Sequence, residues 1–460
     1  MSATFAGERA VVIGCGVSGR AAASVLLAEG AGVRITEARS REEILGGLEE
    51  ADALDGRIEL LAGGHQPDHL DGATLVVASP GVPEGAPVMW WVRERGLRLW
   101  SELELGARLC RVPYVAVTGT NGKTTTTEMV AAVMRADGLS ARSCGNVGFP
   151  FSIAAREGGA DALAVEASSF QLRFQETLHP RVSVLLNLAP DHLDWHESLD
   201  AYASAKARVY ANQSGHDVHV GNRDDPAAAR VSAAAPCEVR WFGGGHPHAH
   251  DIREVGVSDG AVVAGPQELA RPPSGGGAFL ADAAAAAAAA RAFGLSDRAI
   301  RIGLGSFAPL PHRGTVVSEV GSVRFVDDSK ATNPHAALAA LEGLSDAVLI
   351  AGGVAKGVDL SPLASAAPSL AGVVAIGEAS SAIVAIFEGL TPVVRAGSMK
   401  DAVDLAARMV PSGGTVILAP ACASQDMFRD YRDRGEQFAV AARSIGARLA
   451  ERRQGRASHA

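Results

Sequence analysis

The segment from residue 114 to residue 136 constrains the fold more than any other part of the chain. It reads YVAVTGTNGKTTTTEMVAAVMRA, an apolar run followed by the turn Gly119-Thr120-Asn121-Gly122 and a helical pattern that begins at Lys123. A buried strand, a glycine turn and a helix in this order predict a parallel sheet with a phosphate-binding loop. The reason is that glycines let backbone N–H groups turn toward phosphate oxygens at the N-terminus of a helix.

The side chains of this loop suit nucleoside triphosphate chemistry. Lys123 would neutralise the β- and γ-phosphates, the Thr124 hydroxyl could ligate Mg²⁺, and Thr125 follows them in the first helical turn. The strict phosphate-loop pattern has glycine at position 117, where this chain has Val117. A plain strand–loop–helix connection is therefore the alternative interpretation.

A second glycine turn, Gly14-x-Gly16-x-x-Gly19, lies between a predicted strand at Arg9–Ile13 and a predicted helix from Ser18 to Glu29. It fits a dinucleotide-binding fingerprint, and Glu37 at the end of the next strand could contact a ribose. Glycine there also serves tight packing, so the turn favours a nucleotide-like ligand rather than NAD in particular. An oxidoreductase built on this turn is an alternative that leaves the loop around Lys123 unexplained.

Predicted strands and helices alternate along the whole chain, which favours an α/β fold of three successive domains. We place them at residues 1–101, 102–308 and 309–460. The other predicted strands are Val33–Glu37, Ala73–Ser79, Ala162–Glu166, Val182–Asn187, Asp217–Val220, Val323–Val326, Ala347–Ala351, Val373–Ile376 and Thr415–Ala419. Loops are predicted at Gly243–Asp251 and Pro272–Gly277, the latter before an alanine-rich helix at Ala278–Leu295.

Composition excludes several classes of protein. The chain has 460 residues and a net charge of −9, which argues against nucleic-acid binding because that requires a basic face. Its five cysteines are scattered and form no C-x-x-C pair, which predicts a reduced, cytoplasmic protein without a structural zinc. The first residues lack a signal-peptide pattern, and the alanine-rich stretch carries Asp282 and Arg291, so we expect no membrane association. We expect a monomer.

Polar residues follow the predicted strands of the middle third. Glu166 ends one strand and is followed by Ser168 and Gln171, whereas Asn187 ends another and is followed by Asp191-His192. Open α/β sheets place ligands at the carboxyl ends of their strands, where a carboxylate and an imidazole could hold a metal ion. Lys206, by its spacing alone, is predicted to be a solvated helix lysine. Helix capping is the alternative interpretation of Asp191 and Asp194.

The last third carries a comparable polar set. Arg313 and Lys330 suit phosphate or carboxylate anions, and serine or threonine hydroxyls at strand ends suit a second carboxylate. The residues concerned are His312, Arg313, Asp328, Lys330, Thr332, Lys356 and Ser424.

These motifs, taken in order from about residue 8 to residue 450, resemble the Mur ligase family. The resemblance rests on Thr118 to Thr124, Glu166 with Ser168-Ser169-Phe170-Gln171, Asn187 through His192, Lys206, His312-Arg313, Asp328 to Asn333, and Ala421 to Ser424. It implies an N-terminal Rossmann-like domain that binds UDP, a central ATPase-like domain and a C-terminal Rossmann-like domain. It implies an ATP-dependent ligase of peptidoglycan precursor synthesis that adds D-glutamate to UDP-N-acetylmuramoyl-L-alanine through an acyl phosphate.

The resemblance also assigns residue roles. Catalysis and two Mg²⁺ ions would involve Lys123, Thr124, Glu166, His192 and a carbamylated Lys206. ATP would contact Gly119, Thr120, Asn121, Gly122, Lys123, Thr124, Thr125, Asp282, Arg313, Asp328 and Lys330. The UDP-sugar would contact Val17, Ser18, Glu37, Arg39, Gly81, Asn146, Ser168 and Gln171. Glutamate would contact Thr332, Lys356, Ser424 and Tyr431.

One departure from the family pattern lies at the start of the alanine-rich helix. The family usually has His-Asn-x-x-Asn there, whereas this chain has Ala278, Phe279 and Asp282. We expect altered nucleotide affinity or selectivity, with Phe279 stacking on the base. The alternatives are an L-glutamate-adding variant, another ligase of the superfamily, and a non-catalytic nucleotide-binding relative.

Overall fold

The computed structural model describes residues 4–46, 54–196, 198–245, 253–273 and 276–457. The described chain divides into two compact units. The first unit comprises residues 1–188, 195–272 and 281–307, and the second comprises residues 189–194, 273–280 and 308–460.

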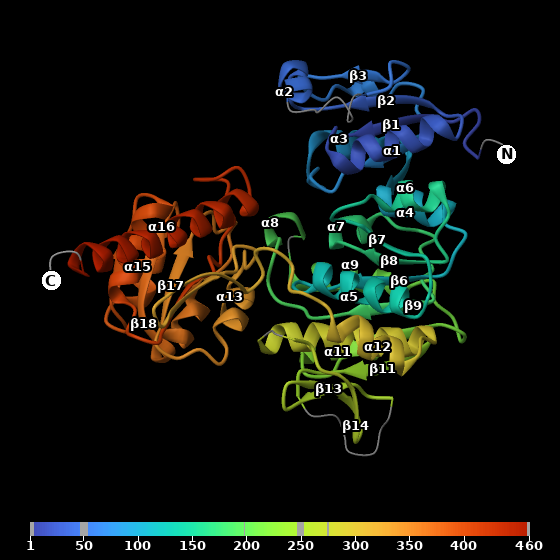
Figure 1. Cartoon of the computed structure of the whole chain (residues 1–460). Coiled ribbons are helices and arrows are strands. Elements are labelled where there is room, and N and C mark those ends of the chain that lie inside the picture. Colours follow the sequence, from blue (N-terminus) through green and yellow to red (C-terminus); the bar gives the residue numbers. More distant parts are fainter. Residues whose placement is uncertain (1–3, 47–53, 197, 246–252, 274–275, 458–460) are drawn as a thin grey trace. The chain divides into compact units, whose positions relative to one another are not determined.

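The first sheet of the first unit is built from the N-terminal hundred residues (Figure 1). Its strand order is β3-β2-β1-β4-β5, and every pair is parallel. The strands are β1 (Arg9–Ile13), β2 (Gly32–Thr36), β3 (Glu59–Leu61), β4 (Leu75–Ala78) and β5 (Arg98–Ser101), and the helices are α1 (Val17–Ala28), α2 (Arg41–Gly46), α3 (Pro87–Glu94) and α4 (Glu102–Leu109). Parallel strands are buried on both faces, which explains the continuous apolar runs of β1 and β4.

A six-stranded parallel sheet, in the order β11-β10-β9-β6-β8-β7, is the second sheet of this unit. Its strands are β6 (Tyr114–Thr118), β7 (Ala141–Gly145), β8 (Ala162–Glu166), β9 (Val182–Leu185), β10 (Val218–Asn222) and β11 (Glu238–Phe242). Its helices include α5 (Lys123–Ala136), α6 (Phe151–Glu157), α7 (Ser169–Arg173), α9 (Leu199–Ala207) and α10 (Pro226–Ser232). The predicted strands at Tyr114–Thr118 and Ala162–Glu166 and the helix Lys123–Ala136 are confirmed residue for residue.

A small antiparallel sheet of three strands was not predicted. It consists of β12 (Gly256–Ser258), β13 (Ala261–Ala264) and β14 (Gln267–Ala270). These strands are three or four residues long, too short for a clear alternation of apolar and polar residues. Most of the loop predicted at Gly243–Asp251 lies outside the described residues.

Helix α11 (Gly277–Phe293) contains the alanine-rich stretch, and α12 (Asp297–Gly305) follows it. Its first residue, Gly277, had been predicted to end the preceding loop. Alanines 283 to 290 are all at most 2% exposed, so the helix packs against protein on every side, as predicted. Within the described residues, no helix combines the length and apolarity needed to cross a membrane.

The second unit contains a mixed six-stranded sheet in the order β15-β16-β20-β17-β18-β19 (Figure 1). Only the β15–β16 pair is antiparallel. The strands are β15 (Thr315–Val320), β16 (Val323–Asp327), β17 (Ala347–Gly352), β18 (Leu370–Ile376), β19 (Val393–Arg395) and β20 (Thr415–Leu418), and the helices include α13 (Pro334–Leu341), α14 (Ser380–Phe387), α15 (Met399–Met409) and α16 (Tyr431–Ala457). Leu349 packs into the core on one face, and Val348 and Ile350 pack into the core on the other.

Candidate active site

The turn between β6 and α5 has the geometry of a phosphate-binding loop. Gly122 precedes the helix in the left-handed conformation, with φ of 83°, and has no side chain of its own to cap the helix N-terminus. The N-terminus of such a helix favours an anion, because its first N–H groups lack partners within the helix. Lys123 folds back over this loop, and its Nζ donates to the carbonyls of Gly119 at 2.9 Å and Thr120 at 2.7 Å.

Two residues from elsewhere in the sheet hold this loop in place. Asn187, just beyond β9, accepts a hydrogen bond from the Asn121 N–H at 2.8 Å and donates to the Asn121 carbonyl at 3.2 Å. The Tyr202 hydroxyl of α9 donates to Thr120 Oγ1 at 3.2 Å. Asn187 was visible in the sequence as a polar strand end, whereas nothing local to Tyr202 indicated its role.

Lys206 lies beside the same loop. Its side chain is 1% exposed, its Nζ donates to the Gly119 carbonyl at 2.6 Å, and it lies 4.5 Å from the centre of the Tyr202 ring. The interpretation of Lys206 as a solvated helix lysine, made from spacing alone, is wrong. Because Lys206 lies beside the phosphate loop, a chemically modified Lys206 side chain could reach a ligand bound there.

Glu166 ends β8, directly next to β6 in the sheet, and is 3% exposed. Its Oε1 accepts a hydrogen bond from Asn146 Nδ2 at 3.1 Å. Among the residues that the structure describes, no three His, Cys, Asp or Glu side chains gather into a metal site. The donors that the first unit offers, the Thr124 hydroxyl and the Glu166 carboxylate, nevertheless fit Mg²⁺, which takes few protein ligands and completes its shell with phosphate and water.

Asp282 of α11 also reaches the phosphate loop. A Cβ built on Gly122 would lie 2.1 Å from the Asp282 carboxylate, so that carboxylate lies directly against the loop. The structure thus brings Asp282 to the predicted ATP-binding residues. Ala278 and Phe279 belong to the second unit.

Five of the candidate UDP residues follow the carboxyl ends of β1, β2 and β4, namely Val17, Ser18, Glu37, Arg39 and Gly81. Val17, which is 60% exposed, and Ser18 begin α1, and Gly81 follows β4. Glu37 accepts hydrogen bonds from the Cys15 N–H at 2.7 Å and from Arg39 Nη2 at 2.9 Å. Burial opposes its charge, but these hydrogen bonds outweigh burial and lower the pKa of Glu37 to about 2. Glu37 therefore ties the glycine turn to Arg39.

Ser168 and Gln171 form a capping box at the start of α7 rather than facing an open surface. Gln171 is 0% exposed, and its Nε2 donates to Glu102 Oε2 at 3.4 Å. Glu102 also accepts from the Ser152 N–H at 2.7 Å, and burial raises its pKa to about 6. Glu102 was not predicted, because its pairing with Gln171 joins distant parts of the chain.

His192 belongs to the second unit, whereas Glu166 and Lys206 belong to the first. His192 has a left-handed backbone, with φ of 54°, and its Nε2 lies 3.7 Å from Asp191 Oδ2. Asp191 accepts one hydrogen bond from the His192 N–H at 2.9 Å, through Oδ1, and one from Asn333 Nδ2 at 3.2 Å, through Oδ2.

The second unit gathers its candidate ATP residues around the end of β16. His312 Nδ1 lies 2.7 Å from Asp327 Oδ2, and the Lys330 Nζ lies 4.2 Å from the centre of the Tyr431 ring. Burial, and then the neighbouring Asp327 carboxylate, raises the pKa of Asp328 to about 7, against the opposing effect of Arg313.

The loops that carry the candidate glutamate residues meet at the same edge of that sheet. The Ala421 N–H donates to the Ala331 carbonyl at 2.9 Å, and Val354 pairs with Ala423 in a β-bridge. These contacts join the loops of Thr332, Lys356 and Ser424.

Arg434 of α16 holds two of these loops, the one that contains Ser329 and the one that contains Cys422. It is 0% exposed and donates to Ser329 Oγ at 2.9 Å, the Ser329 carbonyl at 2.8 Å and the Cys422 carbonyl at 3.0 Å. Sequence reasoning missed it, because an arginine in a charged helix looks like a solvated residue.

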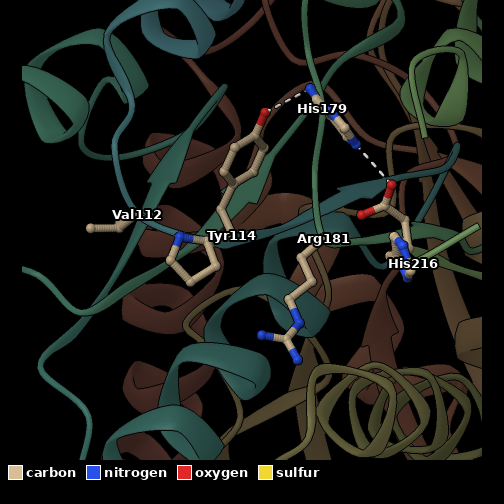
Figure 2. A pocket seen from close by; sticks show the side chains of 7 residues that line it. Val112, Tyr114, His179, Arg181 and His216 are labelled. Carbon is tan, nitrogen blue, oxygen red and sulfur yellow. Dashed lines mark hydrogen bonds and ion pairs between the residues drawn. The ribbon is translucent and has the colours of Figure 1, made fainter. Parts of the chain in front are cut away.

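A cavity of about 460 Å³ lies elsewhere, at the amino ends of β6, β9 and β10 (Figure 2). The His179 N–H donates to the Tyr114 hydroxyl at 2.9 Å, and His179 Nε2 lies 2.8 Å from Asp217 Oδ2. The cavity is lined by Val112, Pro113, Tyr114, His179, Arg181, His216 and Asp217, and none of these is a predicted site residue.

Three family descriptions match the chain in order. They are the Mur ligase MurD-like N-terminal domain over residues 8–101, the Mur ligase middle domain over 117–264, and the Mur ligase glutamate ligase domain over 312–422.

Curated relatives match over nearly the full length. A protein of Frankia casuarinae is 42% identical over 96% of this chain and 95% of its own length, and one of Thermobifida fusca is 40% identical over 95% and 99%. One of Streptomyces coelicolor is 39% identical over 97% of this chain and 100% of its own length. All three are named UDP-N-acetylmuramoylalanine--D-glutamate ligase.

Solved structures share the fold at low identity. The UDP-N-acetylmuramate-alanine ligase MurC of Thermotoga maritima has a TM-score of 0.60 and 18% identity over 95% of this chain and 99% of its own. MurF of Thermotoga maritima, solved in complex with ADP, has a TM-score of 0.58 and 18% identity over 97% of each chain. With this fold, these loops and these full-length relatives, the chain belongs to the Mur ligase family, in its MurD-like branch.

Proposed function

We propose that this protein is an ATP-dependent, ADP-forming ligase that adds D-glutamate to UDP-N-acetylmuramoyl-L-alanine in peptidoglycan precursor synthesis. The observation that carries the proposal is the 39–42% identity, over nearly the full chain, to three proteins that bear this name. The fold alone does not select the substrate, because MurC and MurF share it.

The reaction begins by activating a poor electrophile. An oxygen of the alanyl carboxylate attacks the γ-phosphorus of ATP, a P–O bond to that oxygen forms, the bond to the β-phosphate oxygen breaks, and ADP leaves. The resulting acyl phosphate has a good leaving group. Lys123 and the N–H groups of the loop Gly119, Thr120, Asn121 and Gly122 would hold the phosphates, with Thr125 behind them, and catalysis is mainly positioning and charge neutralisation.

Two Mg²⁺ ions would neutralise charge on the phosphates. Thr124 and Glu166 would hold one, and His192 and a carbamylated Lys206 would hold the other. A carbamate gives the buried Lys206 oxygen donors, which hard cations prefer to an amine. Asp282, Arg313, Asp328 and Lys330 complete the proposed ATP-binding set.

In the second half, the amine nitrogen of glutamate attacks the acyl carbon. The tetrahedral intermediate loses a proton from nitrogen to solvent and expels phosphate as the amide forms. Thr332, Lys356 and Ser424 would bind the glutamate carboxylates, with Tyr431 near its side chain.

The other substrate would be held by the N-terminal sheet and the first loops of the central sheet. We assign it to Val17, Ser18, Glu37, Arg39, Gly81, Asn146, Ser168 and Gln171. Ser168 and Gln171 are buried in the capping box, so they would act by shaping the loop unless that box opens. We propose a cytoplasmic monomer acting on small molecules, without nucleic-acid or membrane partners.

The test is phosphate release by the purified protein with ATP, Mg²⁺, UDP-N-acetylmuramoyl-L-alanine and either D- or L-glutamate, with products weighed by mass spectrometry. We expect turnover with D-glutamate only, and none with the Lys123→Ala variant. Turnover with L-glutamate alone would show that the protein is the variant ligase that adds L-glutamate. No turnover with ATP or GTP would support a non-catalytic relative.

A further inference from the structure

The loop after β3 packs over the end of β2, where the candidate UDP residues lie. The Gly63 N–H donates to the Arg39 carbonyl at 2.8 Å, and the Gly64 N–H donates to the Glu37 carbonyl at 3.1 Å. These two bonds place His65, which is half-buried, beside Thr36 and Glu37. His65 was not among the residues predicted from the sequence.

Two imidazoles share the hydroxyl of Thr36. Thr36 is 0% exposed, and its Oγ1 lies 2.9 Å from His65 Nδ1 and 2.8 Å from His69 Nδ1. A hydroxyl has a single proton to donate, so it can donate to one ring and must accept from the other.

A third hydrogen bond decides which ring accepts. The Gln66 N–H donates to His69 Nδ1 at 3.4 Å, as part of the capping box of the short 3₁₀ helix η2 (Pro67–Leu70). His69 Nδ1 therefore carries no proton and takes the proton of Thr36. It follows that His65 donates its Nδ1–H to Thr36 Oγ1.

This assignment leaves the other nitrogen of His65 as an acceptor. Burial lowers the pKa of His65, an effect that the neighbouring His69 reinforces and that Glu37 opposes, so the ring is neutral at pH 7. With its proton on Nδ1, a neutral ring has a lone pair on Nε2.

We infer that His65 is a specificity-determining residue for the base of the UDP-sugar, its Nε2 accepting a hydrogen bond from the N3–H of uracil. The inference rests on the proposed function. Uracil presents a donor at N3 between two carbonyl acceptors, whereas cytosine presents a lone pair there and would oppose an acceptor. The guanidinium of Arg39, held by Glu37 at 2.9 Å, supplies donors for a uracil carbonyl.

The test is calorimetric titration of the full-length protein with UDP and CDP. We expect the wild type to prefer UDP. His65→Phe removes the acceptor and should weaken UDP binding about tenfold, the factor expected for one lost hydrogen bond, and bring the two affinities together. His65→Gln keeps a carbonyl acceptor near the position of Nε2 and should retain most of the preference.

The matched control is His216→Phe, which replaces an exposed histidine of the same unit and should change neither affinity. ADP binding, measured on every variant, reports whether the fold is intact. If the His65→Phe protein binds ADP normally and still prefers UDP as strongly as the wild type, the inference about His65 is wrong and the proposed function is unaffected. A wild type that binds ADP but no UDP contradicts the proposed function and removes the inference with it.

Discussion

At the scale of single residues, Lys206 shows how burial changes the chemistry available to a side chain. Its amine is enclosed beside the phosphate loop and donates to the Gly119 carbonyl at 2.6 Å. An amine that attacks CO₂ and loses a proton becomes a carbamate, which reverses the charge of the side chain. A carbamate at this position would repel the anionic phosphates unless a cation lay between them, which links the modification to Mg²⁺.

The first prediction concerns that carbamate. We expect Lys206→Ala to lower phosphate release by at least about a hundredfold, because a missing charge-neutralising group typically costs that much, and we expect short carboxylic acids to restore part of it. Rates with and without acetate or propionate measure the rescue. Lys400→Ala, at an exposed lysine paired with Asp404, is the control and should retain full activity without rescue. A folded Lys206→Ala protein that no acid rescues would argue against the carbamate.

At the scale of elements, the contact of α16 with the end of β16 depends on a glycine. A Cβ on Gly435 would lie 2.2 Å from His312 Nδ1 and 2.6 Å from Asp327 Oδ2. The helix can approach this hydrogen-bonded pair only because position 435 has no side chain. The close approach also lets Arg434, the neighbouring residue, reach the loops at Ser329 and Cys422.

The second prediction follows from this contact. Gly435→Ala should destabilise the second unit by about 1–3 kcal/mol, the usual cost of overpacking. It should also raise the KM for ATP by displacing His312 and, with it, the adjacent candidate ATP residue Arg313. The control is Gly305→Ala, also at a helical glycine, whose Cβ would meet its nearest atom at 3.9 Å. That exchange should be neutral or stabilising by up to about 1 kcal/mol. Thermal unfolding and ATP titration of both variants measure these effects, and equal behaviour of the two would contradict the prediction.

A buried polar chain crosses the central sheet from β9 to α10. Ser183 Oγ lies 2.7 Å from His219 Nδ1, and His219 Nε2 lies 2.9 Å from Ser232 Oγ. Burial lowers the pKa of His219 to about 3. The ring is therefore held neutral by the fold, and it charges more readily in the unfolded chain.

The third prediction is the resulting pH dependence. A histidine with a lowered folded pKa contributes stability above its unfolded pKa, and that stability is lost as the pH falls toward the folded value. Between pH 6.5 and pH 5 we expect His219 to remove about 1.5 kcal/mol from the free energy of unfolding of the first unit. Urea unfolding of the wild type and of His219→Phe at several pH values measures the contribution of His219. The free energy of unfolding of the variant should lack this decrease between pH 6.5 and pH 5. His216→Asn should keep the wild-type slope, and identical slopes in all three proteins would contradict the assignment.

At the scale of the whole molecule, the candidate residues are divided between the two units. Lys123, Glu166 and Lys206 belong to the first, and Arg313 and Lys330 belong to the second. The candidate UDP residues belong to the first unit and lie mainly on a different sheet from the phosphate loop. ATP and the UDP-sugar are thus assigned to separate sets of residues.

The fourth prediction concerns stabilisation by ligands. A ligand present at a hundred times its Kd stabilises the folded protein by about 2.7 kcal/mol, so Mg²⁺-ADP and UDP should each raise the melting temperature. Because they are assigned to separate residues, their effects should be cumulative. Lys123→Ala should lose the ADP shift and keep the UDP shift. A variant that lost both shifts while remaining folded would contradict the separation.

Much of the architecture was predictable because its signals are local. The strands of residues 9–13, 114–118 and 162–166 and the helix from Lys123 are confirmed, since each is an uninterrupted apolar run or helical pattern next to a glycine turn. The turn from Gly119 to Gly122 between that strand and that helix belongs to this class. The β12–β14 sheet was missed, because its strands are too short for periodicity to show.

The sequence by itself determined the α/β class, the phosphate loop and the order of motifs that marks the family. Only the tertiary structure decided that Lys206 is buried, that Gln171 turns inward to Glu102, and that His65 lies against Thr36. Each of these properties depends on partners far along the chain, such as Gly119 for Lys206 and Thr36 for His65. Local composition sets which atoms can donate or accept, whereas packing between distant segments sets which of them are already satisfied and which remain for a ligand.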